Sequence, residues 1–236
     1  MRIEVWSDFV CPFCYIGKRT LEQALASFPH KNSVIVSYKS YELEPNAEIK
    51  PQQNIHEILA HKYKTTVEKV KKANDDIAKR AAALGLTYHF DTMQPTNTFD
   101  AHRLVKYAAK HGKGNEMTER LFKAYFTESK LISDHAILID LALELGFDRQ
   151  EIAALLDSCR NTSLVRDDED QAREMGVQGV PFFVFNDTYA LSGAQPAEVF
   201  TEVIEQVWTE EKQQPQVKRL DPKTSGTTYC TDDGCK

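Results

Sequence analysis

The stretch VWSDFVCPFCYIGKRTLEQAL, residues 5–25, passes from strand to helix through two cysteines spaced as C-x-x-C. Residues 2–7 before it alternate between polar and apolar side chains, which predicts a strand. Residues 12–28 after it carry apolar side chains at near-helical spacing. Residues 33–43 are rich in β-branched and aromatic side chains and predict a second strand. Strand, helix and strand in succession predict a β-α-β unit with a right-handed crossover.

A long helical region is predicted next, because apolar periodicity and helix-capping residues recur up to Gly176. The predicted caps of its helices are Thr65, Asn97 or Thr98, Ser133 or Asp134, and Asp148. Strand character then returns in VPFFVFN and TYALSG, which a turn at Asn186-Asp187 joins into a hairpin. Pro196 suits the first turn of a final helix.

This order predicts an α/β fold, written βαβ…ββα, that a large all-helical insertion interrupts. The β-α-β part is assigned to residues 1–50, the insertion to 51–176 and the β-β-α part to 177–212. Residues 213–236 form a polar, turn-rich tail that we expect to be flexible and that ends in a C-x-x-x-x-C pair. The two strand-bearing parts are expected to meet in one sheet.

Composition excludes several classes of function. The chain has 236 residues, a net charge of −6 and no long basic stretch, so nucleic acid is not an expected partner. No apolar run is long enough to span a bilayer. The opening residues MRIEVWSDF do not resemble a secretory leader, so we expect a cytoplasmic protein. Thiols are kept reduced there, which favours catalytic, redox-sensing or metal-binding cysteines over a structural disulfide.

The C-x-x-C pair lies where a helix N-terminus presents unpaired N–H groups and a partial positive charge. A thiolate is stabilised at such a position. We therefore expect Cys11 to be the attacking nucleophile and Cys14, one turn further along, to resolve the mixed disulfide. The alternative is a zinc site, since zinc often uses two cysteine pairs and Cys230 and Cys235 supply a second one. The strand-to-helix context favours redox chemistry, and we expect no bound metal.

A second signal is GVQGVPFF, in which Pro181 directly precedes a predicted strand. A cis Val180-Pro181 bond facing the cysteines would leave the Val180 backbone free to pair with an extended peptide substrate. A trans proline at the start of a strand is the alternative, and these residues alone do not decide between the two.

Five separated motifs resemble the DsbA-like branch of the thioredoxin superfamily, and more narrowly its FrnE-like subgroup of cytoplasmic relatives. In chain order they are DFVCPFCYIGK, YELEPN, NTFDAHRL, GVQGVPFFVFN and SGAQP. The resemblance covers residues 1 to about 210. It implies a thioredoxin-like fold whose helical insertion caps the active-site face. It also implies Cys11 as nucleophile, Cys14 as resolving cysteine and Val180-Pro181 as a substrate-binding cis-proline loop.

Related hydroxychromene-carboxylate isomerases and kappa-class glutathione transferases share this architecture and typically have serine at the nucleophile position. The cysteine at position 11 favours thiol–disulfide exchange instead. Pro12-Phe13 lacks the histidine of periplasmic DsbA proteins, which implies a more reducing potential. Glutathione is the one co-substrate that the resemblance implies, and no other cofactor is expected.

Four further residues are candidates for the chemistry. Cys230 and Cys235 flank a turn-forming Asp-Asp-Gly, and some FrnE-like proteins carry such a pair. They would pass disulfides to the C-x-x-C pair as a redox relay, or have no function. Asp8 would cap the active-site helix or accept a proton from the resolving thiol. His102 would assist proton transfer, or belong to a capping or surface cluster with Asp100 and Arg103.

Two other features are expected to be structural. Cys159 has no partner at C-x-x-C spacing and is expected to be a buried free thiol. The acidic run at residues 167–170 is expected to be a solvated helix face.

The sequence therefore predicts a cytoplasmic thiol–disulfide oxidoreductase or isomerase that acts on protein or peptide disulfides or on glutathione, with a role in oxidative stress. The alternatives are a glutathione-dependent isomerase or transferase, and a zinc-binding, chaperone-like module. Nothing in the sequence indicates the oligomeric state, the physiological substrate or the direction of catalysis.

Overall fold

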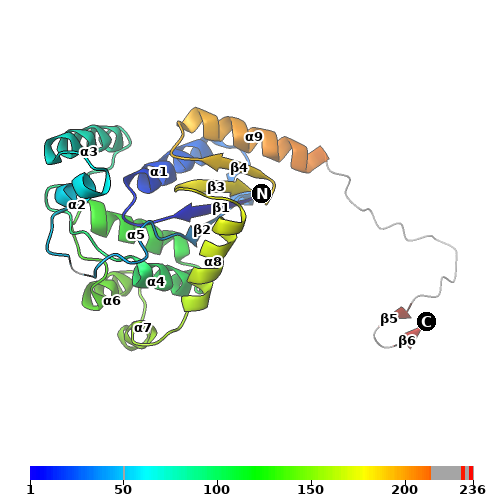
Figure 1. Cartoon of the computed structure of the whole chain (residues 1–236). Helices are drawn as coiled ribbons and strands as arrows, with labels where there is room; N and C mark the ends of the chain where they lie inside the picture. Colours follow the sequence, from blue (N-terminus) through cyan, green and yellow to red (C-terminus); the bar gives the residue numbers. More distant parts are fainter. Residues whose placement is uncertain (50, 214–229, 232–233, 236) are drawn as a thin grey trace.

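The computed structural model describes residues 1–49, 51–213, 230–231 and 234–235. A mixed four-stranded sheet lies at its centre, in the order β2-β1-β3-β4 (Figure 1). Its strands are β1 (Arg2–Ser7), β2 (Ile35–Ser40), β3 (Phe182–Phe185) and β4 (Tyr189–Ser192). β1 pairs in parallel with β2 and antiparallel with β3, which pairs antiparallel with β4. The first and last parts of the fold thus share one sheet, as predicted.

Two helices cover one face of the sheet, α1 (Pro12–Ser27) and α9 (Ala197–Gln213) (Figure 1). A short 3-10 helix, η1 (Lys31–Ser33), precedes β2. Between β2 and β3 the chain forms α2 (Ile55–Lys62), α3 (Val67–Ala82), α4 (Phe99–Lys110), α5 (Gly114–Phe126), α6 (His135–Glu144), α7 (Arg149–Leu156) and α8 (Thr162–Glu174). This arrangement confirms the α/β class and the helical insertion.

Each face of the sheet buries its own apolar cluster. On the face covered by α1 and α9, apolar strand residues pack against apolar residues of both helices. The rings of Phe183 and Phe200 meet edge-on there, with centroids 4.8 Å apart. On the other face, Trp6 and Val184 pack against Ala172 of α8. Because the sheet is covered on both faces, the end of β1 and the start of α1 are held in a fixed position.

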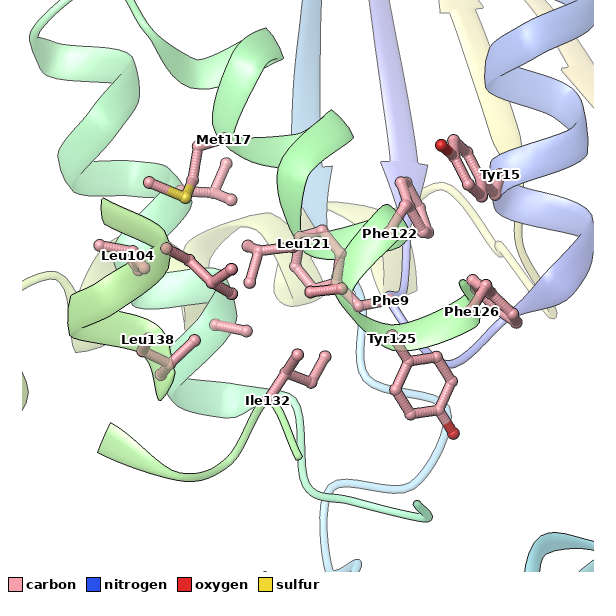
Figure 2. Close-up of a cluster of buried hydrophobic side chains, with 14 of the residues drawn as sticks. Phe9, Tyr15, Leu104, Met117, Leu121, Phe122, Tyr125, Phe126, Ile132 and Leu138 are labelled. Carbon is pink, nitrogen blue, oxygen red and sulfur yellow. The ribbon is translucent and has the colours of Figure 1, made fainter. Parts of the chain in front are cut away.

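The largest cluster joins the helical region to the start of α1 (Figure 2). Tyr15 of α1 stacks on Phe122 of α5 with ring centroids 4.9 Å apart and planes 6° apart. Phe9, which follows β1, lies 5.2 Å from the same ring. The insertion therefore packs directly on one aromatic residue on each side of the cysteine pair, Phe9 and Tyr15, and aromatic burial of this kind is a strong apolar contribution.

Several predicted boundaries need correction. β2 is shorter than residues 33–43, because the Ser40 N–H donates to the Asp168 carboxylate at 2.7 Å and the chain then leaves the sheet. Helix α2 was not predicted, although Asn54 forms a capping box with Glu57 at its start. The cap of α3 is Thr66, one residue after the predicted Thr65.

Other caps follow the prediction more closely. Asp134 and Asp148 accept hydrogen bonds from the first turns of α6 and α7. Asn97 accepts from the Phe99 N–H at 2.9 Å, whereas Thr98 makes no side-chain cap. The hairpin between β3 and β4 turns through Asn186 and Asp187, with φ of 49° and 56°. Two successive positive φ angles are those of a type I′ turn.

The acidic run at residues 167–170 is not a solvated face as a whole. Asp168 is only 5% exposed and forms ion pairs with Lys106 and with Lys39, the latter at 3.3 Å. Its backbone carbonyl also accepts from the Trp6 indole at 2.8 Å. A buried carboxylate must be paired to be tolerated, so α8 is joined to α4 and to the sheet through this residue. Among the described residues, no helix is both long and apolar enough to cross a membrane.

Candidate functional site

Cys11 is the N-cap residue of α1, with an extended backbone (φ −89°, ψ 111°), and Pro12 is the first helical residue. The Cys11 side chain makes no capping hydrogen bond to its own helix. Its Sγ donates instead to the Val180 carbonyl oxygen at 3.5 Å. The sulfur thus lies between the positive end of a 16-residue helix and the loop that precedes β3.

Cys14 lies behind Cys11 in the first turn of α1. Its N–H donates to the Cys11 carbonyl at 3.0 Å, and only 1% of the residue is exposed, against 5% for Cys11. Both thiols are free. Burial raises the pKa of the Cys14 thiol well above its usual value, and the neighbouring Cys11 raises it further. Cys11 is therefore the more accessible sulfur, and Cys14 is held as a buried neutral thiol.

The Val180–Pro181 peptide bond is cis. The Pro181 carbonyl accepts from the Gly193 N–H at 2.8 Å, which ties the loop to the residues after β4. On the other side, a Cβ built on Gly17 of α1 would lie 3.0 Å from the Pro181 ring. A glycine at position 17 therefore lets the helix approach the loop without displacing the Pro181 ring. The Val180 N–H has no hydrogen-bond acceptor within the described residues.

The helical region closes another side of the site. The Tyr88 hydroxyl, from the segment after α3, donates to the Pro12 carbonyl at 2.8 Å, and its ring stacks on Phe126 at 4.4 Å. Phe13, between the two cysteines, is 37% exposed. The insertion thus contacts the C-x-x-C turn itself and leaves one aromatic side chain of that turn at the surface.

Asp8 does not cap α1, contrary to one expectation. Its Oδ2 accepts from the Leu43 N–H at 2.8 Å, and its Oδ1 lies 3.4 Å from Nε2 of His102. His102 is 3% exposed, and its ring packs 4.7 Å from that of Phe9, so the surface-cluster reading of His102 is also wrong. Arg103 is buried as well and donates to carbonyl groups at the end of α7.

Glu42 joins this buried group and was not singled out from the sequence. Its Oε2 accepts from Nη1 of Arg166 at 2.6 Å. Burial raises the pKa of Glu42, and the Arg166 guanidinium opposes part of that rise. Within the described structure, Asp8 Oδ1, His102 Nε2 and Glu42 Oε1 all lack a hydrogen-bond partner. Glu42 lies in the motif YELEPN, and that motif was the available signal.

The remaining cysteines lie elsewhere. Cys159 follows α7 and is exposed, so the expectation of a buried thiol is wrong. Cys230 and Cys235 belong to two short strands, β5 (Cys230–Thr231) and β6 (Gly234–Cys235). The two strands pair antiparallel with Cys230 opposite Cys235, and the side chains of both lie outside the described part. In the portion of the chain that the structure describes, no three His, Cys, Asp or Glu residues are grouped so as to hold a metal ion.

Comparison with known proteins gives consistent results. The chain is 36% identical to a probable DsbA oxidoreductase from Streptomyces coelicolor, with a TM-score of 0.86 over 100% of this chain and 98% of that one. It is 29% identical to the uncharacterized protein YwbO of Bacillus subtilis (strain 168), over 86% of this chain and 96% of that protein.

Two more distant structures share the fold. They are 2-hydroxychromene-2-carboxylate isomerase and the cytosolic disulfide reductase DsbM of Pseudomonas aeruginosa with GSH. The first matches at 15% identity with a TM-score of 0.68, over 92% of this chain and 100% of that one. The second matches at 16% identity with a TM-score of 0.60, over 90% and 98%.

The family model that describes the DSBA-like thioredoxin domain matches residues 2–205, which include every strand of the central sheet and the first half of α9. The protein is therefore a member of the DSBA-like thioredoxin domain family.

Proposed function

We propose that the chain is a thiol–disulfide oxidoreductase that works through Cys11 and Cys14. The observation that carries the proposal is the position of Cys11. Its thiol lies at the N-terminus of α1 and contacts the Val180 carbonyl of the cis-proline loop, with Cys14 buried one turn behind it. The N-terminus of a helix is a usual setting of a reactive thiolate.

The proposed reaction has two steps. In the first, the Cys11 thiolate attacks one sulfur of a substrate disulfide, and the other substrate sulfur leaves as a thiolate that takes up a proton. In the second, Cys14 loses its proton and attacks Cys11, which forms the Cys11–Cys14 disulfide and releases the second substrate thiol. Two electrons pass from the enzyme dithiol to the substrate. A dithiol or glutathione would then reduce the enzyme.

The substrate is proposed to be a protein or peptide disulfide, or glutathione disulfide. The Val180 N–H without an acceptor supports this, because an extended peptide could pair with it beside Cys11. The fold shared with DsbM, whose structure was solved with GSH, supports the glutathione arm. A cytosolic location and a role in oxidative stress belong to the same proposal, and the description of DsbM as cytosolic supports the location.

Asp8 and His102 are proposed to take up the proton of Cys14. Their facing atoms, 3.4 Å apart and without other partners in the described structure, are suited to sharing a proton. A cavity of about 10 Å³ between Ser7 and His102 is about the size of one water molecule. Such a water would extend the path to Ser7, four residues before Cys11. A D8N variant is expected to slow the second step while leaving the first unchanged.

Cys230 and Cys235 are proposed as a second pair that exchanges disulfides with the first. Their opposed backbone positions in β5 and β6 support this. Replacement of both by serine is expected to reduce turnover with protein substrates. Unchanged turnover would exclude the relay.

The direct test is reduction of insulin by wild-type protein and by a Cys11→Ser variant, with Cys159→Ser as the matched control. We expect activity in the wild type and in the control, and none in Cys11→Ser. Activity that survives in Cys11→Ser would contradict the proposal.

A glutathione-dependent isomerase is the second candidate, which the fold shared with 2-hydroxychromene-2-carboxylate isomerase favours. It would convert its substrate with no net change in free thiols, and it would not reduce insulin.

A further inference from the structure

Arg80, near the end of α3, extends from the helical insertion to two segments next to the cysteine pair. Its Nη2 donates to the Ala194 carbonyl oxygen at 2.5 Å. Its Cζ lies 5.8 Å from the centroid of the Phe13 ring, within the range of a cation–π contact. One guanidinium thus contacts two segments that are far apart in the sequence.

Both segments border Cys11. Phe13 is the residue immediately before Cys14 in the C-x-x-C turn. Ala194 follows Gly193, whose N–H donates to the carbonyl of the cis-proline Pro181. A Cβ built on Gly17 would lie 3.0 Å from the Pro181 ring and 3.6 Å from the Ala194 side chain, so Gly17 packs closely beside both residues. Arg80 therefore places a positive charge beside the C-x-x-C turn and beside the segment that holds the cis-proline loop.

Most N–H donors of the Arg80 guanidinium have no acceptor among the described residues. Arg80 is exposed, it forms no ion pair with a described carboxylate, and Ala194 supplies its one recorded hydrogen-bond acceptor. A guanidinium has five N–H donors, so most of them are open to a ligand. The neighbouring Lys79, by contrast, is paired with Asp76 at 3.0 Å. Arginine with free donors beside an apolar ring is well suited to a two-point contact with a carboxylate.

We propose that Arg80 binds a carboxylate of the substrate, and that the site therefore selects small disulfides that carry a carboxylate, such as glutathione disulfide. This proposal rests on the thiol–disulfide exchange proposed above and names its substrate class. Arg80 takes no part in the transfer of electrons or protons. It holds the anionic group while Cys11 attacks the sulfur, so it acts on substrate binding and not on the chemical step.

The experiment uses three disulfides of similar size and different charge: 3,3′-dithiodipropionate, 2-hydroxyethyl disulfide and cystamine. Pre-reduced protein is mixed with each, and the loss of the Cys11 and Cys14 thiols is followed by quenching with an alkylating agent. The variants are R80Q and R80K, and K79Q is the matched control on the adjacent exposed residue of the same helix.

For R80Q we expect the half-saturating concentration of dithiodipropionate to rise about five- to tenfold. This is the change expected when one charge-assisted hydrogen-bond contact is lost at an exposed site. The limiting rate and the reaction of the neutral disulfide should not change, and cystamine should react no more slowly. R80K should be intermediate because lysine keeps the charge but not the planar fork. K79Q should behave like the wild type. Salt at about 0.5 M should remove the preference of the wild type for the anionic disulfide.

Equal shifts for all three disulfides in R80Q would show that Arg80 only supports the Phe13 and Ala194 segments, and would overturn the proposal. An unchanged half-saturating concentration for dithiodipropionate would overturn it too. If the wild type reacts with no disulfide faster than Cys11→Ser does, the proposed function fails.

Binding of S-methylglutathione, which cannot exchange disulfides, then tests the site by itself. Binding that is at least about fivefold weaker in R80Q supports the carboxylate site, and equal binding overturns it.

Discussion

Replacement of Gly17 by alanine should show whether the close approach of α1 to the cis-proline loop matters. The new Cβ would lie 3.0 Å from the Pro181 ring, 3.1 Å from the Phe183 ring and 3.6 Å from the Ala194 side chain. Alanine favours the helix by about 1 kcal/mol over glycine. Overpacking of a well-packed site costs about 1–3 kcal/mol.

The packing term should outweigh the helix term, because the neighbours of Gly17 have little room to move. Pro181 is buried, and Phe183 is fully buried against Phe200. We therefore expect a net loss of about 1 kcal/mol in the free energy of unfolding, or about 2–4 °C in Tm for a chain of this size. Ordinary contact at 3.4 Å requires a shift of about 0.4 Å at the cis-proline loop. If rate falls about 100-fold per 1 Å of misplacement, this shift lowers activity about sixfold.

The assay compares thermal unfolding and insulin reduction for G17A and for G179A. Gly179 lies two residues before Pro181, and a Cβ there would meet nothing within 4 Å, so G179A is the matched control. We expect the control to keep wild-type activity and to be unchanged or slightly more stable. A G17A protein that is more stable than the wild type and fully active would contradict this prediction, because it would show that the helix and loop are not in tight contact.

Two further predictions concern charge. D168N should lower the free energy of unfolding by about 3 kcal/mol, because it leaves the buried Lys106 ammonium without its carboxylate. In the same denaturant titration D170N, whose carboxylate forms an exposed pair with Arg173, should change the free energy of unfolding by less than about 0.5 kcal/mol. Equal effects of the two substitutions would contradict the burial of the Asp168–Lys106 pair. The second prediction concerns the release of substrate thiol from an isolated mixed disulfide between Cys11 and substrate. The release rate should rise about tenfold per pH unit between about pH 7 and 9, because burial raises the pKa of Cys14 and the thiolate fraction of Cys14 grows with pH throughout that interval. A rate that does not change over that interval would show that Cys14 is already ionised.

The fold could be predicted largely from local signals. Three of these signals are each contained within a short stretch of sequence. They are the alternation of polar and apolar residues over 2–7, the helical spacing of apolar residues after Cys11, and the turn at Asn186-Asp187. These signals predicted β1, α1 and the β3–β4 hairpin close to their observed bounds. Helix α2 was missed because its eight residues offer too few turns for a clear period.

Burial of charged groups could not be predicted in the same way. Asp168 pairs with Lys106, 62 residues earlier, and Glu42 pairs with Arg166, 124 residues later. Within its own stretch of sequence each of these residues resembles a solvated charge. The partner that makes burial tolerable is supplied by the packing of another element.

The same limit applied around the cysteines. The C-x-x-C spacing pointed to Cys11 and Cys14, but nothing near Arg80 in the sequence indicates that it contacts Phe13 and Ala194. That contact exists because α3 packs beside α1 (Figure 1). Chemistry that depends on one turn of chain was visible in the sequence, whereas chemistry assembled from distant segments required the structure.

Identification of the sulfur that first bonds to substrate tests the role of Cys11 most directly. A Cys14→Ser variant cannot complete the second step, so it should accumulate a mixed disulfide with a small disulfide probe. Cys159 is exposed and could react nonspecifically, so the experiment is done with Cys159 also replaced by serine. Peptide mapping should place the probe on Cys11 within one turnover. A probe found only on the tail cysteines, or no adduct at all, would contradict the assignment of Cys11 as the nucleophile.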